Sequence, residues 1–264
     1  MSMQGSVRIE WDGQPHDIEY AMVGVDDARA PCMVFLHEGL GSVALWRDFP
    51  QRLCEELGLR GFVYSRPGYG GSTPRPPELL WDPDFMHRQA ELVLPRVLQT
   101  AGITGTPWLF GHSDGASIAL LHAARFPQSV TGVVALAPHV FVEDLTVRNI
   151  EAAREAYVSG DLKPRLARYH ADVDSAFWGW NRIWLDARFR DWNIEADIAG
   201  AQCPVLVVQG LDDEYGTLEQ LRKIERALPQ ARCVELADCG HSPHRDQPEA
   251  VIDAVRGFVE SLRT

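Results

Sequence analysis

The chain has 264 residues, of which 45% are hydrophobic, and a formal net charge of −12 at pH 7. Its length fits one large α/β domain or two small ones, and its hydrophobic content is ample for a buried core. Because the charge is strongly negative and no basic stretch occurs, nucleic-acid binding and the steering of strongly anionic substrates are both disfavoured.

The cysteines and the first residues of the chain bear on its compartment. Five cysteines stand at irregular spacing without a CxxC pair, so we expect neither a disulfide framework nor a zinc site. The N-terminus is polar and lacks the apolar core of a signal peptide, and no apolar run reaches the length of a membrane span. We therefore expect a cytoplasmic protein with no metal and no membrane partner.

Alternating hydrophobicity over residues 7–23 predicts an antiparallel hairpin at the start of the chain. Continuous apolar runs follow, of the kind found in strands buried on both faces. These predicted strands lie at residues 32–36, 62–65, 108–110, 130–136, 204–209 and 233–236. The predicted helices lie at residues 46–57, 84–100, 116–126, 218–228 and 248–262.

Two irregular features interrupt this pattern: a loop over residues 66–77, rich in glycine and proline, and Pro95, a predicted kink inside a helix. Strands that alternate with helices predict an α/β fold with a doubly wound, mostly parallel sheet and helices on both faces.

The strand pattern stops between Ala137 and Cys203, and this segment of about 65 residues has helical patterns rich in tryptophan. The segment is too short and too poor in strands to form an independent core. We therefore predict a helical cap, residues 139–202, inserted into a core made of residues 1–138 and 203–264.

Gly111, Ser113 and Gly115 form a Gly-x-Ser-x-Gly pattern between a predicted strand and a predicted helix. This arrangement is typical of a nucleophile elbow, in which a sharp turn lifts one serine clear of the backbone. Larger side chains at the two glycines would collide with the strand or the helix. A glycine-bounded turn with an incidental serine is the alternative, and the strand before and the helix after the motif argue against it.

A serine becomes a nucleophile when a base removes its proton and a third group orients that base. In a doubly wound sheet such groups follow the carboxyl ends of strands. Asp212 and Asp213 come directly after one predicted strand, and His241 follows the last one. With Ser113 they stand in the chain order serine, aspartate, histidine.

Several segments together resemble the α/β-hydrolase fold superfamily across nearly the whole chain. They are residues 37–42, 65–72, 111–115, 210–213 and 240–241. The resemblance implies a cofactor-free hydrolase with Ser113 as nucleophile and His241 as general base. The family's Gly-x-x-Asp pattern selects Asp213 over Asp212 as the orienting acid. His244 competes with His241, but a Gly-His pair directly after a strand favours His241, which leaves His244 as a surface or supporting residue.

The resemblance also assigns the oxyanion hole to the backbone N–H groups of Gly39 and Asp114. Glu38 departs from the family's pattern, which commonly has glycine at this position. Its carboxylate either turns away toward the neighbouring loop or lies with that of Asp114 near the substrate, where the pair would favour a cationic group such as an amine. The Ser-Asp-Gly elbow is similar to that of amino-acid-ester hydrolases, which supports the second alternative.

Aromatic residues of the predicted cap form either its core or the roof of an apolar pocket for an acyl or aryl group. The predicted pocket residues are Glu38, Phe141, Phe177, Trp178, Trp180 and Trp184. Three further histidines, His37, His112 and His139, lie near strand ends, and we interpret them as hydrogen-bonded scaffold groups rather than bases.

These features predict a hydrolase that cleaves a small carboxylic ester or thioester through an acyl-enzyme. A carbon–carbon bond hydrolase of diketones uses the same triad and stays open, as do a perhydrolase and a hydroxynitrile lyase. A dehalogenase is disfavoured, because that branch has aspartate at the position of Ser113. A ligand-binding receptor of the same fold is opposed by the complete set of three residues.

Overall fold

The computed structural model describes residues 3–76 and 78–262, so that Pro77, the last residue of the predicted loop, lies outside the described residues. Among these residues eight strands form one sheet in the order β1-β2-β4-β3-β5-β6-β7-β8. β2 is antiparallel to both of its neighbours and all other pairs are parallel. The strands are β1 (Met3–Trp11), β2 (Gln14–Gly24), β3 (Cys32–Leu36), β4 (Arg60–Tyr64), β5 (Trp108–His112), β6 (Gly132–Leu136), β7 (Val205–Gly210) and β8 (Ala231–Leu236). The predicted mostly parallel sheet is confirmed.

The turn of the first hairpin follows from two residues. Asp12 and Gly13 both have positive φ, 52° and 71°. A two-residue turn of this kind matches the right-handed twist of the strands that it joins. The two strands are therefore joined by a tight turn, and the first strand begins four residues before the predicted start, at Met3 rather than at residue 7.

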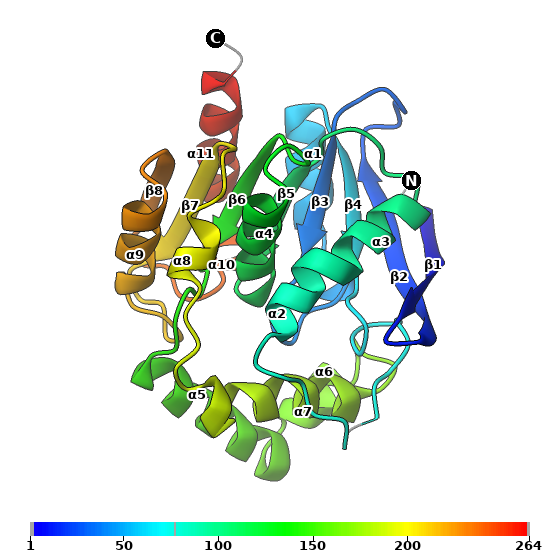
Figure 1. Ribbon diagram of the computed structural model, residues 1–264, viewed down its shortest axis with the longest axis vertical. Coiled ribbons are helices and arrows are strands. Elements are labelled where there is room, and N and C mark those ends of the chain that lie inside the picture. Colours follow the sequence, from blue (N-terminus) through cyan, green and yellow to red (C-terminus); the bar gives the residue numbers. More distant parts are fainter. Residues whose placement is uncertain (1–2, 77, 263–264) are drawn as a thin grey trace.

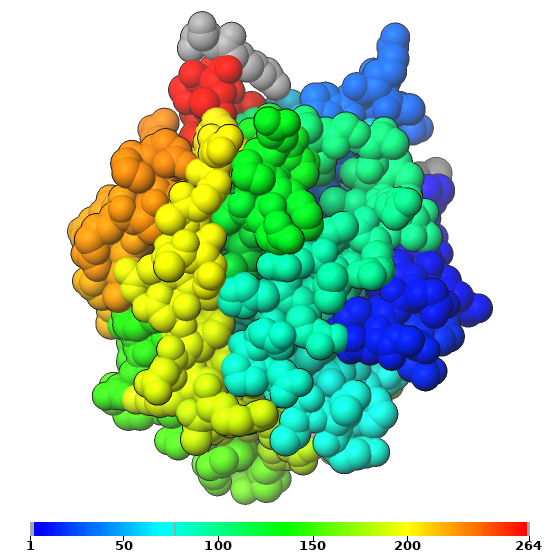
Figure 2. All heavy atoms as spheres, in the orientation of Figure 1, coloured from blue at the N-terminus to red at the C-terminus, as the bar shows by residue number. Residues whose placement is uncertain are grey.

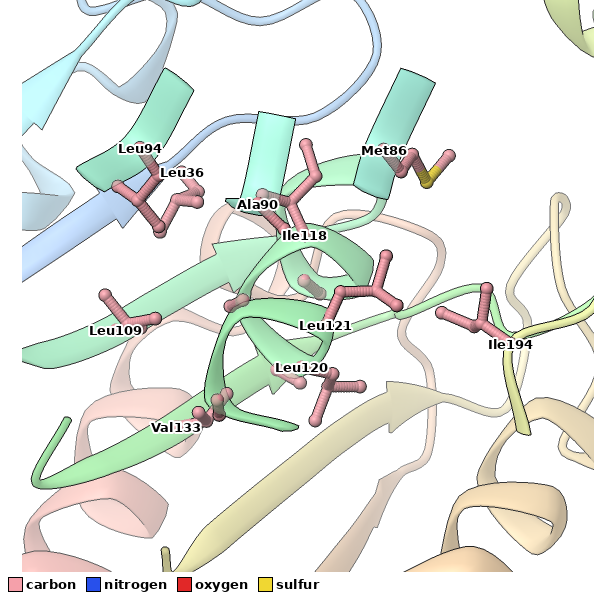
Figure 3. Close-up of a cluster of buried hydrophobic side chains, with 14 of the residues drawn as sticks. Leu36, Met86, Ala90, Leu94, Leu109, Ile118, Leu120, Leu121, Val133 and Ile194 are labelled. Atoms are coloured by element: carbon pink, nitrogen blue, oxygen red, sulfur yellow. The ribbon is translucent and has the colours of Figure 1, made fainter. Parts of the chain in front are cut away.

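Strand side chains alternate between two covered faces. Met33 and Phe35 belong to a buried cluster with α1 (Phe49–Leu57) and α11 (Pro248–Ser261). Val34 and Leu36 belong to the cluster on the opposite face, with α4 (Asp114–Arg125) and α9 (Glu219–Ala227). Figure 1 shows α4 in front of the sheet, and Figure 3 shows its side chains gathered with those of the strands and of the helices that cover it.

The predicted helix at residues 84–100 is broken into three parts: α2 (Phe85–Arg88), a π-helical turn (Gln89–Val93) and α3 (Leu94–Thr100). Pro95 lies in the first turn of α3. A proline ring clashes with the carbonyl four residues earlier in a regular α-helix, and a wider turn relieves that clash. The predicted irregularity is therefore present as a π-helical turn, which lies one turn before Pro95, rather than as a kink at that residue.

Other element boundaries differ by a few residues from the prediction. The helix expected from residue 46 begins at Phe49, after a single 3-10 turn (Ala44–Trp46), and the elbow helix begins at Asp114 rather than at residue 116. A short helix that was not predicted, α10 (Pro243–Asp246), follows the loop that carries His241. Its proline at the first helical position supplies the fixed φ angle with which helices commonly start.

Between β6 and β7 the described chain forms helices and adds no strand to the sheet. They are α5 (Asp144–Ser159), α6 (Leu162–Leu166), α7 (Val173–Trp184), a 3-10 turn (Ala187–Phe189) and α8 (Glu195–Ile198). In Figure 1, α5, α6 and α7 lie together beyond one end of the sheet, at the bottom of the view. The division into a core and a cap at residues 139–202 stays a prediction.

The segment after α7 also returns over the front face of the sheet. Phe189 packs against Phe85 with ring centroids 5.8 Å apart, and Asp197 Oδ2 lies 3.4 Å from His87 Nε2. Figure 2 shows these two segments, yellow and cyan, side by side on the face that Figure 1 shows in front of the sheet. No helix within residues 3–76 and 78–262 is long and apolar enough to cross a membrane.

Candidate active site

Ser113 stands in a strained turn between β5 and α4, with φ at 52° and ψ at −118°. Such angles cost a non-glycine residue about 1–3 kcal/mol and persist where the surroundings enforce them. The Ser113 N–H donates a hydrogen bond of 2.9 Å to the Leu136 carbonyl, which ties the turn to β6. A Cβ at Gly111 would lie 2.3 Å from the Gly115 carbonyl oxygen, and one at Gly115 would lie 2.0 Å from the Leu36 oxygen. Both glycines are therefore required for α4 to approach the sheet.

The side chains of Ser113, His241 and Asp213 lie in a continuous row. His241 Nε2 is 3.0 Å from Ser113 Oγ, and His241 Nδ1 is 2.8 and 3.0 Å from the two carboxylate oxygens of Asp213. Asp212 is exposed, whereas Asp213 is buried. The structure thus brings Asp213, and not its neighbour, to the imidazole.

Backbone groups fix the Asp213 carboxylate. The N–H groups of Tyr215 and Gly216 donate to its Oδ1 at 2.8 and 3.1 Å. Burial raises the pKa of Asp213, but its hydrogen bond with His241 and the charge of that ring outweigh burial, and the net pKa is lowered. Burial lowers the pKa of His241, but the hydrogen bond and charge of Asp213 outweigh it, and the net pKa is raised. Asp213 is thereby kept ionised, and the His241 ring beside it is favoured to accept a proton.

Gly39 and Asp114, the predicted sources of the oxyanion hole, line the same cavity as Ser113 and His241. Asp114 is the first residue of α4, so its N–H belongs to the positive end of the helix dipole. Gly39 lies directly under Trp180 of α7, because a Cβ at Gly39 would be 2.1 Å from Trp180 Cδ1. Only glycine fits beneath this indole.

The other histidines near the strand ends are engaged with the backbone. His37 Nδ1 donates to the Glu38 carbonyl at 2.6 Å, and His112 Nε2 donates to the His241 carbonyl at 2.6 Å. His139 Nε2 donates to the Tyr215 carbonyl at 3.2 Å. These contacts agree with the scaffold interpretation of all three rings.

His244 is not at the surface. Its ring is buried between Trp46 and His112, with centroid distances of 4.8 Å to each. Burial lowers the pKa of His244 well below its ordinary value. The ring therefore supports the wall behind the site, and the surface alternative for His244 is wrong.

Glu38 has features of both predicted alternatives, the one turned toward the neighbouring loop and the one near the substrate. It lines the cavity, and it also contacts the neighbouring loops, with Oε2 3.5 Å from His112 Nδ1 and Oε1 3.7 Å from Arg245 Nη2. Gly41 makes room for this side chain, since a Cβ there would clash with Glu38 Oε2. Burial raises the pKa of Glu38, but His112 and Arg245 outweigh it, and the net pKa lies well below the ordinary value.

The Asp114 carboxylate is almost fully buried and also has a cationic neighbour. Trp184 Nε1 donates to its Oδ1 at 3.2 Å, and Arg66 Nη2 lies 3.7 Å from its Oδ2. Burial raises the pKa of Asp114 against the opposing effect of Arg66. Each of the two site carboxylates therefore faces a guanidinium group of the protein itself.

The cavity has a volume of about 120 Å³. Of the predicted pocket residues, Glu38, Trp180 and Trp184 line it. The structure does not bring the other three to its wall. Phe177 stacks on Tyr157 inside the helical segment at 3.6 Å. Trp178 lies against Arg182 at 5.1 Å, and Phe141 lies under Lys223 at 4.6 Å.

Five further lining residues were not predicted as pocket residues: Leu40, His139, Thr146, Ile150 and Tyr215. Thr146 and Ile150 are one helical turn apart on α5, so the buried face of that helix carried a usable signal. A second signal concerns Tyr215. It lies two residues after Asp213, the spacing at which an aspartate side chain accepts a hydrogen bond from the backbone of its own turn. Among the described residues no three His, Cys, Asp or Glu side chains are arranged to hold a metal ion.

Comparisons with known proteins show which family this chain resembles. A sequence model of the alpha/beta hydrolase family matches residues 33–254. The sn-1-specific diacylglycerol lipase ABHD11 of Mus musculus is 23% identical over 276 residues, covering 94% of this chain and 87% of that protein. The pimeloyl-[acyl-carrier protein] methyl ester esterase of Aromatoleum aromaticum is 28% identical, covering 86% and 99%. A solved thermophilic esterase from Thermogutta terrifontis has a TM-score of 0.76 at 18% identity, covering 99% and 100%.

The chain therefore belongs to the alpha/beta hydrolase family, since the family match spans most of its length. It is an enzyme of the hydrolase class. Both sequence relatives named above are ester hydrolases by name, one a lipase and one an esterase.

Proposed function

We propose that this protein hydrolyses a small carboxylic ester or thioester through a covalent acyl-enzyme, with no cofactor. The observation that carries the proposal is the row of contacts from Ser113 Oγ through the His241 ring to the Asp213 carboxylate, at 3.0 and 2.8 Å. A hydroxyl, a base and an oriented carboxylate at these distances are what acyl transfer to serine requires. The names of the lipase and esterase relatives support an ester as the substrate.

Acylation begins when His241 Nε2 accepts the hydroxyl proton of Ser113 while Oγ bonds to the substrate's carbonyl carbon. The N–H groups of Gly39 and Asp114 stabilise the oxyanion that forms. The His241 imidazolium, stabilised by Asp213, then donates its proton to the leaving oxygen or sulfur. The ester or thioester bond breaks, and the acyl group stays on Ser113 Oγ.

Deacylation repeats these steps with water as the nucleophile. His241 accepts a proton from water as its oxygen bonds to the acyl carbon, and the same two N–H groups stabilise the second oxyanion. Ser113 Oγ then leaves and regains its proton from His241. The carboxylic acid product departs, and the free enzyme is restored.

The substrate's acyl group lies in the cavity under the helical segment, which acts as the cap. Its walls include Trp180, Trp184 and Tyr215, which favour an apolar group. A volume of about 120 Å³ favours a short acyl chain over a long one. Because Glu38 and Asp114 already face Arg245 and Arg66, we do not assign them to a substrate amine.

The proposal is tested with a fluorophosphonate probe and a series of p-nitrophenyl esters. We expect the wild type to be labelled once per chain, Ser113→Ala to remain unlabelled, and short esters to be hydrolysed faster than long ones. A wild type that is neither labelled nor active on any ester would overturn the proposal. A ring-cleavage diketone is the comparison substrate: its cleavage without ester hydrolysis identifies a carbon–carbon hydrolase instead.

A further inference from the structure

Arg66 is a buried arginine next to the site, and the proposed mechanism gives its positive charge no role. It follows β4 by two residues, and it is only 1% exposed, among the largest fully buried side chains of the molecule. A buried guanidinium is costly unless its charge and its donors are used. Arg66 does not line the cavity, so any role in the reaction passes through the groups that it contacts.

The first contact is to the peptide that supplies one oxyanion donor. Arg66 Nη2 donates to the Glu38 carbonyl at 2.8 Å, and His37 Nδ1 donates to the same oxygen at 2.6 Å. The Nδ1 proton is assigned because His37 Nε2 accepts from the Arg66 N–H at 3.0 Å. Two donors therefore hold one carbonyl.

That carbonyl and the N–H of Gly39 belong to the same planar peptide unit. In a trans peptide the C=O and the N–H point in opposite directions. Two donors on the Glu38 oxygen therefore fix the direction of the Gly39 N–H, and they also polarise the amide so that its N–H becomes a stronger donor.

The second contact is to the residue that supplies the other oxyanion donor. Arg66 Nη2 lies 3.7 Å from Asp114 Oδ2, and the two side chains are 2% and 1% exposed. A carboxylate this close to the site opposes negative charge on the substrate oxygen, because buried charges are screened weakly. The guanidinium compensates this carboxylate.

We propose that Arg66 is a positioning residue of the oxyanion hole: it aims the Gly39 N–H and neutralises Asp114 without touching the substrate. The inference rests on the proposed function, because it needs an oxyanion to stabilise. The loop after β4 would thus hold the oxyanion hole in place, a task that neither Ser113 nor His241 performs.

The test compares Arg66→Met and Arg66→Lys with Arg75→Met. Arg75 is a matched control, since it is a buried arginine of the same loop whose guanidinium lies over Trp81 at 3.3 Å, away from the cavity. Loss of a direct oxyanion donor reduces kcat about 10²–10³-fold, so we expect Arg66→Met to reduce it about 10–100-fold. Arg66→Lys is expected to recover part of this loss, and Arg75→Met to keep the wild-type kcat.

Three readouts separate this role from a general structural one. KM for a p-nitrophenyl ester should stay constant in Arg66→Met, because the ground state does not use the oxyanion hole. Affinity for a boronic acid, which forms a tetrahedral adduct on serine, should fall in parallel with kcat. The acidic limb of the pH profile should not move, because the row from Ser113 to Asp213 is intact. Rates are divided by the active sites counted by complete fluorophosphonate labelling.

If Arg66→Met does not fold, the double variant Arg66→Met/Asp114→Asn removes both buried charges and is compared with Asp114→Asn alone. A kcat loss that persists in the double variant supports the inference. Wild-type kcat and boronic acid affinity in the Arg66 variants, or an equal loss in Arg75→Met, would overturn it. Failure of the proposed function looks different: the wild type would not be labelled at Ser113.

Discussion

Two carboxylate–imidazole contacts lie next to each other in this site: Asp213 with His241, and Glu38 with His112. The two rings are 5.2 Å apart, and in both contacts the carboxylate faces Nδ1. The rings differ in their other nitrogen. His241 Nε2 faces Ser113 Oγ, whereas His112 Nε2 is used on the His241 carbonyl. A neighbouring carboxylate therefore does not distinguish the two rings, and only His241 has an Nε2 that faces the serine hydroxyl, as the proposed base requires.

The carboxylates also differ in how firmly they are held. Asp213 contacts its imidazole at 2.8 Å and accepts two backbone N–H groups, whereas Glu38 is 3.5 Å from His112 and its side chain is 17% exposed. Hydrogen bonds from the backbone keep a carboxylate ionised and oriented. The Asp213 contact is thus built to hold one geometry, and the Glu38 contact is looser.

The largest loss of activity is expected when Asp213 is replaced by asparagine. An amide group in place of the carboxylate favours the wrong imidazole tautomer, and in serine proteases the equivalent change costs about 10⁴ in kcat. We expect Asp213→Asn to lose about 10³–10⁴ in kcat on a p-nitrophenyl ester. Asp212→Asn is the matched control and should stay within about twofold, because its side chain is exposed. Equal losses in both variants would contradict the assignment of the acid.

The pH dependence of the activity reports on the contact between Asp213 and His241. In the proposed mechanism neutral His241 is the base, and its net pKa is raised, so we expect activity to fall as pH drops through a value above the ordinary histidine pKa of about 6.5. Below that point kcat/KM should decline about tenfold per pH unit. In Asp213→Asn the raising effect is lost and burial remains, so the acidic limb should move to lower pH. A wild-type limb below the ordinary value would contradict this account of His241.

Replacement of His112 tests the second contact, with a smaller expected effect. His112→Leu removes the donor to the His241 carbonyl and loosens the loop that carries the base. We expect kcat to fall about fivefold with KM unchanged, since one neutral hydrogen bond contributes about 1 kcal/mol. His112→Gln keeps an N–H donor and should lie closer to the wild type. Equal and large losses in both variants would instead indicate that His112 is itself a base.

The smallest expected effect concerns Glu38 and a substrate amine. Because Arg245 faces Glu38 and Arg66 faces Asp114, paired esters with and without an α-amine should be hydrolysed at rates within about threefold of each other. The measurement is kcat/KM for the two esters at a pH where the amine is charged. A preference of more than about thirtyfold for the amine would restore the cationic-substrate alternative.

The sheet was predictable from the sequence, because strands buried on both faces are written as short apolar runs. The residues at their carboxyl ends were predictable too, since Gly111 and Gly115 mark the elbow and the pairs at 212–213 and 240–241 follow strands. The choice between Asp212 and Asp213 came from family resemblance. The physical reason for that choice is the geometry of the turn, in which the N–H groups of Tyr215 and Gly216 donate to the Asp213 carboxylate.

The pocket was less predictable, because helical periodicity identifies a buried face but not the layer that it contacts. Phe177 and Trp180 share the buried face of α7, yet Phe177 stacks on Tyr157 of α5 and Trp180 reaches Gly39. Nor does a local pattern reveal Arg66. Its role depends on a contact with the Glu38 carbonyl, 28 residues earlier in the chain.

Tyr215 connects the carboxylate beside His241 with the wall of the cavity. Its N–H holds the Asp213 carboxylate, and its carbonyl accepts hydrogen bonds from Thr146 and His139. Thr146 belongs to α5 and lines the cavity wall. The Tyr215 carbonyl shares its peptide unit with the Gly216 N–H, which also donates to the Asp213 carboxylate. Redesign of the wall at Thr146 for a bulkier acyl chain is therefore expected to disturb the carboxylate beside His241, so that a change in selectivity also changes turnover.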